Sequence, residues 1–175
     1  MSGHASPDIR NYYVGKGIVS FKKDGEEEFR DLGNVPTFEF TPSISTLDHF
    51  SHRVGVKTKD RTVVLEKSGK IKLVMEEWTA QNLALALLGD ITTDTAGHEV
   101  IEIFSANAVS GELKFTGTNE IGPKFEYHFL RVDFIPGQSV SPLSDEWGQI
   151  EIEGDVVAVE GSFGTVTKLS EEDSE

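Results

Sequence analysis

The sequence contains no cysteine, which excludes disulfide bonds, thiolate metal sites and a cysteine nucleophile. It also has no long apolar run. The longest purely aliphatic stretch is the six residues from Leu83 to Leu88, whereas a helix that spans a membrane needs roughly 20. The first seven residues have no apolar segment of the kind found in signal peptides. We therefore expect a soluble protein that is made in a cytoplasm and does not enter a membrane.

Basic residues are scarce and unevenly placed. The 16 lysines and arginines are outnumbered by 30 acidic residues, which gives a net charge of −14. The two signs balance at 12 each over residues 1–87, so the whole excess comes from residues 88–175, with 4 basic and 18 acidic residues. Such a surface repels DNA and anionic lipid unless its few cations cluster.

The cations do cluster, because seven lysines and arginines stand against two acidic residues between His52 and Lys72. One interpretation is a solvated basic loop and a separate solvated acidic face. The other is that the two regions meet between copies of the protein, since head-to-tail contacts of this kind build rings or filaments.

The pattern of apolar residues is mainly that of β-strands. A chain of 175 residues is long enough for one domain with its own core. Phe38 and Phe40 alternate with polar residues, as do Ile71, Leu73 and Met75. Many short strands and one helix predict an antiparallel β-sandwich or partly open barrel with a flanking helix. The expected strands are residues 17–22, 29–32, 37–41, 63–66, 71–78, 99–104, 111–116, 124–134, 149–152 and 156–165.

The one expected helix covers about residues 79–89. Thr79 is a suitable N-cap, and Gly89 is expected to end the helix in the left-handed conformation. Leu83, Leu87 and Leu88 form an apolar stripe that we expect to pack on a sheet.

Composition divides the chain into three parts. Residues 1–14 are predicted to form a flexible arm, residues 15–166 the β domain, and residues 167–175 a disordered acidic tail. Within the domain, residues 42–61 are polar and unpatterned, which predicts a long loop. Residues 67–70 are expected to form a turn before the next strand.

Motifs for catalysis or cofactors are weak. Asp48, His49 and His52 have a spacing found in metal sites, but the sequence offers no additional ligand residue at a useful spacing from them. The glycines of residues 15–17 lack the third glycine of a nucleotide-binding loop. We expect no metal site, no cofactor and no catalytic site.

Carboxylate pairs and tryptophans give no stronger signal. Adjacent carboxylates, as at Glu76–Glu77 and Asp145–Glu146, point to opposite faces of a strand and cannot share acid–base work there. Trp78 and Trp147 are interpreted as packing residues rather than as a sugar-stacking platform.

An acidic stripe is the most informative pattern near the end of the chain. In a strand over residues 149–155, Ile150 and Ile152 would face one way, with Glu151, Glu153 and Asp155 on the other side. Like charges on one face do not stabilise one another, so the stripe is either a solvated edge or a surface with a function.

Three motifs together resemble the major tail tube proteins of long-tailed bacteriophages. They are Tyr13-Val14-Gly15-Lys16-Gly17, then Asp31-Leu32-Gly33-Asn34-Val35-Pro36, then Leu73-Val74-Met75-Glu76-Glu77-Trp78-Thr79-Ala80-Gln81-Asn82-Leu83-Ala84-Leu85-Ala86-Leu87-Leu88-Gly89. The resemblance covers about residues 12–90. Beyond it, only the acidic and β-rich character agrees.

The resemblance implies a structural subunit rather than an enzyme. Six copies would form a ring, and rings would stack into a hollow tube around a tape-measure protein, between tail terminator and distal tail or baseplate proteins. The protein would be located in the virion tail after assembly in the host cytoplasm. Genomic DNA would pass through the bore without specific binding.

The resemblance also suggests a role for the long loop, and the acidic residues beyond it allow a hypothesis about the bore. The long loop would reach a neighbouring subunit or ring through Asp48, His49, Arg53, Lys57, Lys59 and Arg61. We expect Glu151, Glu153 and Asp155 to face the bore, with Glu99, Glu102 and Glu126 as weaker candidates, because an acidic wall keeps DNA sliding. One alternative is a carbohydrate- or host-binding β-sandwich module, which would need an exposed aromatic platform such as Trp147 with Tyr127. The other is a secretion-system tube subunit.

Overall fold

The computed structural model describes residues 6–135 and 139–170. It confirms a mainly β protein with an antiparallel sheet of eight strands and a single α-helix in the described residues. The strands of this sheet are β1 (Gly17–Lys23), β2 (Arg30–Asp31), β3 (Thr37–Ser51), β4 (Thr58–Met75), β7 (Val109–Gly117), β8 (Phe125–Ile135), β9 (Ile150–Val156) and β10 (Gly164–Lys168). In the described residues the sheet does not close into a barrel: its order is β2-β1-β7-β8-β9-β4-β3, and β10 also pairs with β8.

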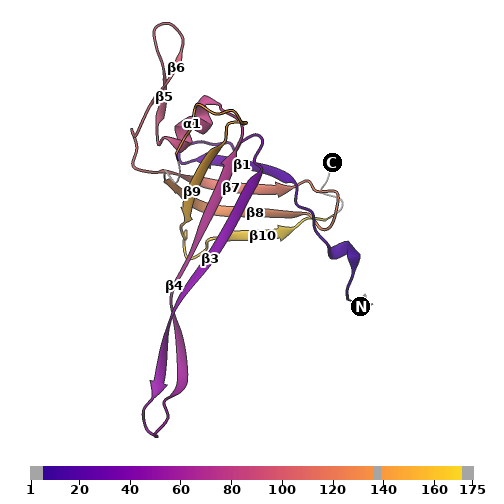
Figure 1. Cartoon of the computed structure of the whole chain (residues 1–175), viewed down its shortest axis with the longest axis vertical. Coiled ribbons are helices and arrows are strands. Elements are labelled where there is room, and N and C mark those ends of the chain that lie inside the picture. Colours follow the sequence, from indigo (N-terminus) through magenta and orange to yellow (C-terminus); the bar gives the residue numbers. More distant parts are fainter. Residues whose placement is uncertain (1–5, 136–138, 171–175) are drawn as a thin grey trace.

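The sheet bends into two crossing layers (Figure 1). Strands β1, β7, β8 and β10 lie side by side, and β9, β4 and β3 cross them steeply. The bend occurs at β8, whose first half pairs with β10 and whose second half pairs with β9.

The core fills the angle between these layers. Ile71, Leu73 and Met75 are fully buried on one side of β4, as the alternation predicts. Ile152 lies beside Leu73 on the adjacent strand β9, and Phe134 of β8 belongs to the same buried cluster. Each such side chain contributes roughly 1.5–3 kcal/mol by leaving water.

Helix α1 (Ala80–Ala86) is shorter than predicted at its C-terminal end. Thr79 caps it as expected, since its Oγ1 accepts the Asn82 N–H at 3.1 Å. Leu88, not Gly89, has the left-handed conformation, with φ 49°. Gly89 serves a different purpose: a Cβ there would lie 2.6 Å from Ile101 Cγ2, so glycine permits the close approach of the next hairpin.

The leucine stripe is only partly as predicted. Leu88 is buried and Leu83 packs against the core, whereas Leu87 is half-buried. Leu85, which the stripe omits, is buried in its place. The helix therefore buries more of its surface than the predicted leucine stripe alone would.

The predicted long loop at residues 42–61 is wrong. Strands β3 and β4 pair along almost their full length, and only residues 52–57 connect them. The apolar residues Ile44, Leu47 and Phe50 are three apart, so they hide the two-residue period of a strand. Bulges interrupt the pairing between Ser45 and Thr46 and between His49 and Phe50.

The predicted turn at residues 67–70 is also wrong, because this segment lies inside β4. Gly69 is paired with Pro42, and a Cβ on Gly69 would lie 2.4 Å from the ring of Phe40. The glycine therefore makes room for an aromatic ring rather than forming a turn. Pro42 is tolerated because β3 is an edge strand.

A second, two-stranded sheet consists of β5 (Asp90–Thr93) and β6 (Glu99–Glu102). The sequence pattern predicts β6 but misses β5, whose four residues are all exposed. This hairpin projects beyond α1 at one end of the molecule, opposite the β3–β4 hairpin (Figure 1).

The predicted arm and tail lie partly outside the described residues. Residues 1–5 and 171–175 are not described, but residues 6–14 contain a 3-10 turn (Ile9–Asn11), and Val14 N–H donates to the Ile121 carbonyl. Thr167 and Lys168, predicted to begin a disordered tail, pair with β8 as the end of β10.

Candidate functional site: an acidic sheet face and two charged hairpins

The acidic stripe lies on β9 with the predicted orientation. Ile150 and Ile152 are buried, while Glu151 and Glu153 are half-buried and Asp155 is exposed. The three carboxylates therefore share the outer face of the β9–β4–β3 layer. We call this surface the β9 face.

Lysines of β4 stand next to these carboxylates. Lys72 is opposite Glu153 and Lys70 is opposite Asp155 in the register of the two strands. Lys72 Nζ also lies 2.9 Å from Glu151 Oε1, and this hydrogen bond is the main reason that the Lys72 pKa is raised. The stripe is thus partly neutralised within the chain, a feature that the spacing of acidic residues alone does not reveal.

Two further carboxylates lie on the β9 face. Glu39 of β3 is opposite Lys72, and Asp133 of β8 is opposite Asp155. The paired strands thus place five carboxylates, two lysines and one arginine on this surface, because Arg131 Nε lies 3.0 Å from Asp133 Oδ1. Neither Glu39 nor Asp133 is singled out by the sequence pattern.

The weaker acidic candidates are not part of this face. Glu99 and Glu102 lie on β6, in the separate two-stranded sheet. Glu126 lies in the first half of β8, where it pairs with Thr116 and Thr167 and accepts a 3.5 Å hydrogen bond from Thr116 Oγ1.

The far part of the β3–β4 hairpin, residues 44–67, is termed the distal hairpin. It extends well beyond the rest of the sheet (Figure 1). Its apolar side chains have little to pack against within the described chain, and eight are more than two-fifths exposed, with Val56 reaching 75%. They are Ile44, Leu47, Phe50, Val54, Val56, Val63, Val64 and Leu65. An exposed apolar surface of this extent marks an interaction site.

Polar residues of the predicted loop are arranged along the same hairpin. Asp48 accepts from Thr62 Oγ1 at 2.7 Å and pairs with Lys59 at 3.0 Å; the Thr62 bond is the main cause of its lowered pKa. His49 Nδ1 lies 2.6 Å from Asp60. Because Asp48 and His49 have separate partners, they do not form a joint metal site. No group of three potential metal ligands occurs among the residues that the structure describes.

The β5–β6 hairpin, residues 90–104, is acidic and ends on an unusual backbone. Phe104 has φ 58° and is 68% exposed. A bulky residue in this conformation costs about 1–3 kcal/mol, and such strain is concentrated at functional positions. Two backbone hydrogen bonds of 3.0 Å hold this segment against the end of α1, from Phe104 N–H to Leu87 O and from Ala106 N–H to Leu88 O.

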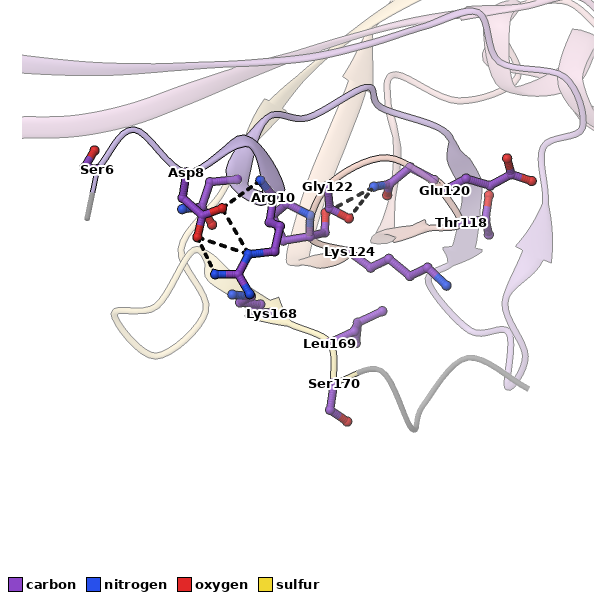
Figure 2. A pocket seen from close by; sticks show the side chains of 13 residues that line it. Ser6, Asp8, Arg10, Thr118, Glu120, Gly122, Lys124, Lys168, Leu169 and Ser170 are labelled. Carbon is purple, nitrogen blue, oxygen red and sulfur yellow. Dashed lines mark hydrogen bonds and ion pairs between the residues drawn. The ribbon is translucent and has the colours of Figure 1, made fainter. Parts of the chain in front are cut away.

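A polar groove lies where residues 6–11 meet the connection between β7 and β8 and the end of β10 (Figure 2). Its volume is about 930 Å³, and Arg10, Lys124 and Lys168 line it together with Asp8. Arg10 is bound by Asp8 through contacts as short as 2.7 Å, and these bonds lower the Asp8 pKa to about 2. The arrangement is an ion pair rather than a set of groups ready for proton transfer.

A charged cluster crosses β1, β7 and β8. Glu112 lies 2.5 Å from Lys22 Nζ and 2.8 Å from His128 Nε2. The hydrogen bond from Lys22 is the main reason that the Glu112 pKa is lowered. Lys22 and Lys114 both lie over the Phe29 ring, at 5.1 and 4.7 Å.

Two of the matched sequence motifs meet in space. The Asn34 N–H donates to Glu77 Oε1 at 3.1 Å, and Asn34 also binds Glu76. Gly33 has φ 81°, and the Glu77 carboxyl group occupies the space that a Cβ on Gly33 would need. These residues therefore join the β2–β3 connection to the start of α1.

Asn82 completes this junction and is 1% exposed. Its Nδ2 donates to the Leu32 carbonyl at 3.1 Å and the Glu77 carbonyl at 2.9 Å. Its Oδ1 accepts from Arg30 Nη1 at 2.8 Å, and burial lowers the Arg30 pKa. The motif residues are structural here, a role that no catalytic interpretation of the sequence would identify.

The tryptophan platform of the alternative hypothesis is not assembled. Trp147 is 92% exposed, but Tyr127 is half-buried in an aromatic cluster, with its ring 5.9 Å from that of Phe115 and 6.4 Å from that of Phe38. Exposed Trp147 also contradicts its interpretation as a packing residue.

Comparison with protein families places the chain in one of them. No helix among the described residues is both long and apolar enough to cross a bilayer. No curated protein matches the chain. A family model described as "Protein of unknown function UCP028589" matches residues 12–111, which include the junction around Asn82 and the distal hairpin. Since the match covers more than half of the 175 residues, the protein belongs to this family.

Proposed function

We propose that the protein is the structural subunit of a phage tail tube, in which rings of copies stack into a hollow conduit for DNA. The observation that carries this proposal is the distal hairpin. It displays a long apolar surface that a single chain leaves exposed. Removing such a surface from water is favourable, so copies of the chain gain stability by covering it.

The open sheet supports the same function. Strand β3 is an edge strand, and β10 pairs only with β8, so the described part of the chain presents unpaired strand edges. Natural proteins protect such edges, and joining sheets around a ring is one way to do so.

The β9 face supports an acidic bore. DNA carries one negative charge per about 1.7 Å of duplex, and a wall that binds its phosphates would hold it in place. Five carboxylates against two lysines and Arg131 give this face an excess of negative charge, with Glu151, Glu153 and Asp155 at its centre. In a ring of six copies, that excess would surround the DNA from all sides.

Sedimentation and electron microscopy test the proposal. Wild-type protein, concentrated stepwise, is expected to shift from slowly sedimenting subunits to large particles that appear as rings or hollow tubes of uniform width. A secretion-system tube subunit would form similar particles. Whether DNA passes through the bore distinguishes the two functions. A monomer at every concentration that binds glycans through Trp147 would support the host-binding alternative instead.

A further inference from the structure

The two projecting hairpins carry opposite charge. The distal hairpin has five lysines and arginines against three carboxylates, while the β5–β6 hairpin has four carboxylates and no lysine or arginine. The basic residues are Arg53, Lys57, Lys59, Arg61 and Lys67, and the acidic residues of the other hairpin are Asp90, Asp94, Glu99 and Glu102.

Several charged residues of the two hairpins have no partner of opposite charge in the part of the chain that the structure describes. Among the described residues, Arg53, Lys57 and Arg61 form no ion pair, and neither do Glu99 and Glu102. All five residues are exposed. Opposite charges that stay unpaired in one molecule are available to pair between two.

Both hairpins also expose apolar side chains. Ile103 and the strained Phe104 are 59% and 68% exposed at the base of the β5–β6 hairpin. The distal hairpin offers Leu47, Phe50 and Val63. Aromatic and apolar anchors surrounded by complementary charges are the usual make-up of a specific interface.

The hairpins lie at opposite ends of the long axis of the molecule (Figure 1). One chain therefore cannot bring its own two surfaces together, whereas a second copy placed along this axis can. Such a contact joins different surfaces of identical chains, so each copy offers a free surface to the next and the assembly can grow.

We infer that the distal hairpin of one copy docks on the β5–β6 hairpin of the next copy, with Arg53 and Lys57 facing Glu99 and Glu102 and with Phe104 as an apolar anchor. The inference rests on the proposed function and names the two surfaces that meet along the assembly. It also removes Glu99 and Glu102 from the bore, because the contact between copies uses them.

Charge reversal and rescue test this contact through the lowest protein concentration at which particles pellet. Reversing the distal hairpin (Arg53→Glu with Lys57→Glu) is expected to raise that concentration about tenfold or more, a change that corresponds to roughly 1.4 kcal/mol. Reversing the acceptor (Glu99→Lys with Glu102→Lys) is expected to have the same effect. Combining all four substitutions in one chain is expected to restore assembly to within about threefold of wild type.

A matched control separates local pairing from net charge. Asp145→Lys with Glu146→Lys makes the same charge change on exposed residues outside both hairpins. Added to the reversed distal hairpin, it is expected to restore nothing. The inference is overturned if the acceptor reversal fails to rescue, or if this control rescues equally well.

The failure of the inference is distinguishable from that of the proposed function. If wild-type protein stays monomeric at all concentrations, the proposed function fails. If the wild-type protein forms tubes, and all four charge variants form them at the same protein concentration, the proposed function is supported and only this contact is refuted. Far-ultraviolet circular dichroism of each variant verifies that the subunit is folded.

Discussion

At the scale of single residues, buried polar groups hold the matched motifs together. Asn82 satisfies two backbone carbonyls and the Arg30 guanidinium at once. Removing its amide leaves all three without that partner in a site with almost no water access. An unsatisfied buried polar group costs about 1–3 kcal/mol, and more when a charge is involved.

Asn82→Ala is therefore expected to lower the free energy of unfolding by about 2–4 kcal/mol. Urea denaturation of the subunit below its assembly concentration measures this change. Asn107→Ala, at an exposed position, provides the matched control and should change it by no more than about 0.5 kcal/mol. Equal effects of the two substitutions would contradict the structural role of Asn82.

The Glu112 cluster predicts a pH dependence of stability. The Glu112 pKa is lowered from 4.5, chiefly by its hydrogen bond from Lys22. A carboxylate with a lowered pKa stabilises the fold above its unfolded-state pKa, and this contribution is lost as pH falls through the folded-state value.

Glu112→Gln is thus expected to destabilise the subunit by about 0.2–1 kcal/mol near neutral pH, because the group is partly exposed and screened. Well below pH 4.5 the difference from wild type should disappear. Urea denaturation at several pH values measures it. A difference that grows as the pH falls would refute this account.

Phe104 connects backbone strain to assembly. Phe104→Asn places a residue that tolerates positive φ at this position, so the subunit should lose no stability and can be compared directly with wild type. Loss of the exposed ring is expected to raise the pelleting concentration several-fold. Unchanged pelleting, with unchanged thermal stability, would mean that the ring anchors nothing.

At the scale of elements, alternation predicts strands wherever one face is buried. It identifies the inward residues Ile71, Leu73 and Met75 of β4 and the outward carboxylates of β9, because burial imposes a two-residue period there. It fails in the distal hairpin, where neither face is covered in the single chain and two bulges shift the register. The part of the sequence that is hardest to interpret is therefore the part that we propose to meet another copy.

The distal hairpin yields a prediction for the whole element. Leu47→Ser and Val63→Thr change a cross-strand pair that is 60% and 43% exposed. The subunit should lose less than about 1 kcal/mol of stability, because these side chains gain little burial in it. Assembly should weaken strongly, since both side chains would be buried between copies. Pelleting assays and urea denaturation compare the two effects, and a variant that pellets like wild type would contradict the role of the hairpin.

At the scale of the whole molecule, the balance of charge decides whether DNA slides or stays bound. The sequence locates the acidic stripe, but only the strand register shows that Lys70 and Lys72 offset part of it and that Glu39 adds a further carboxylate opposite Lys72.

Replacing Glu151, Glu153 and Asp155 by lysine should create tubes that retain short duplex DNA at low salt and release it as salt rises. Lysines at the exposed residues Glu26, Glu27 and Glu28 provide the charge-matched control.

A cryo-electron microscopy reconstruction of particles formed by the wild-type protein tests the central claim most directly. The account predicts stacked rings around an open channel, with the carboxylates of β9 facing the channel and the distal hairpin in contact with a neighbouring copy. A channel lined by lysine and arginine, or a protein that forms no repeating assembly at any concentration, would contradict it.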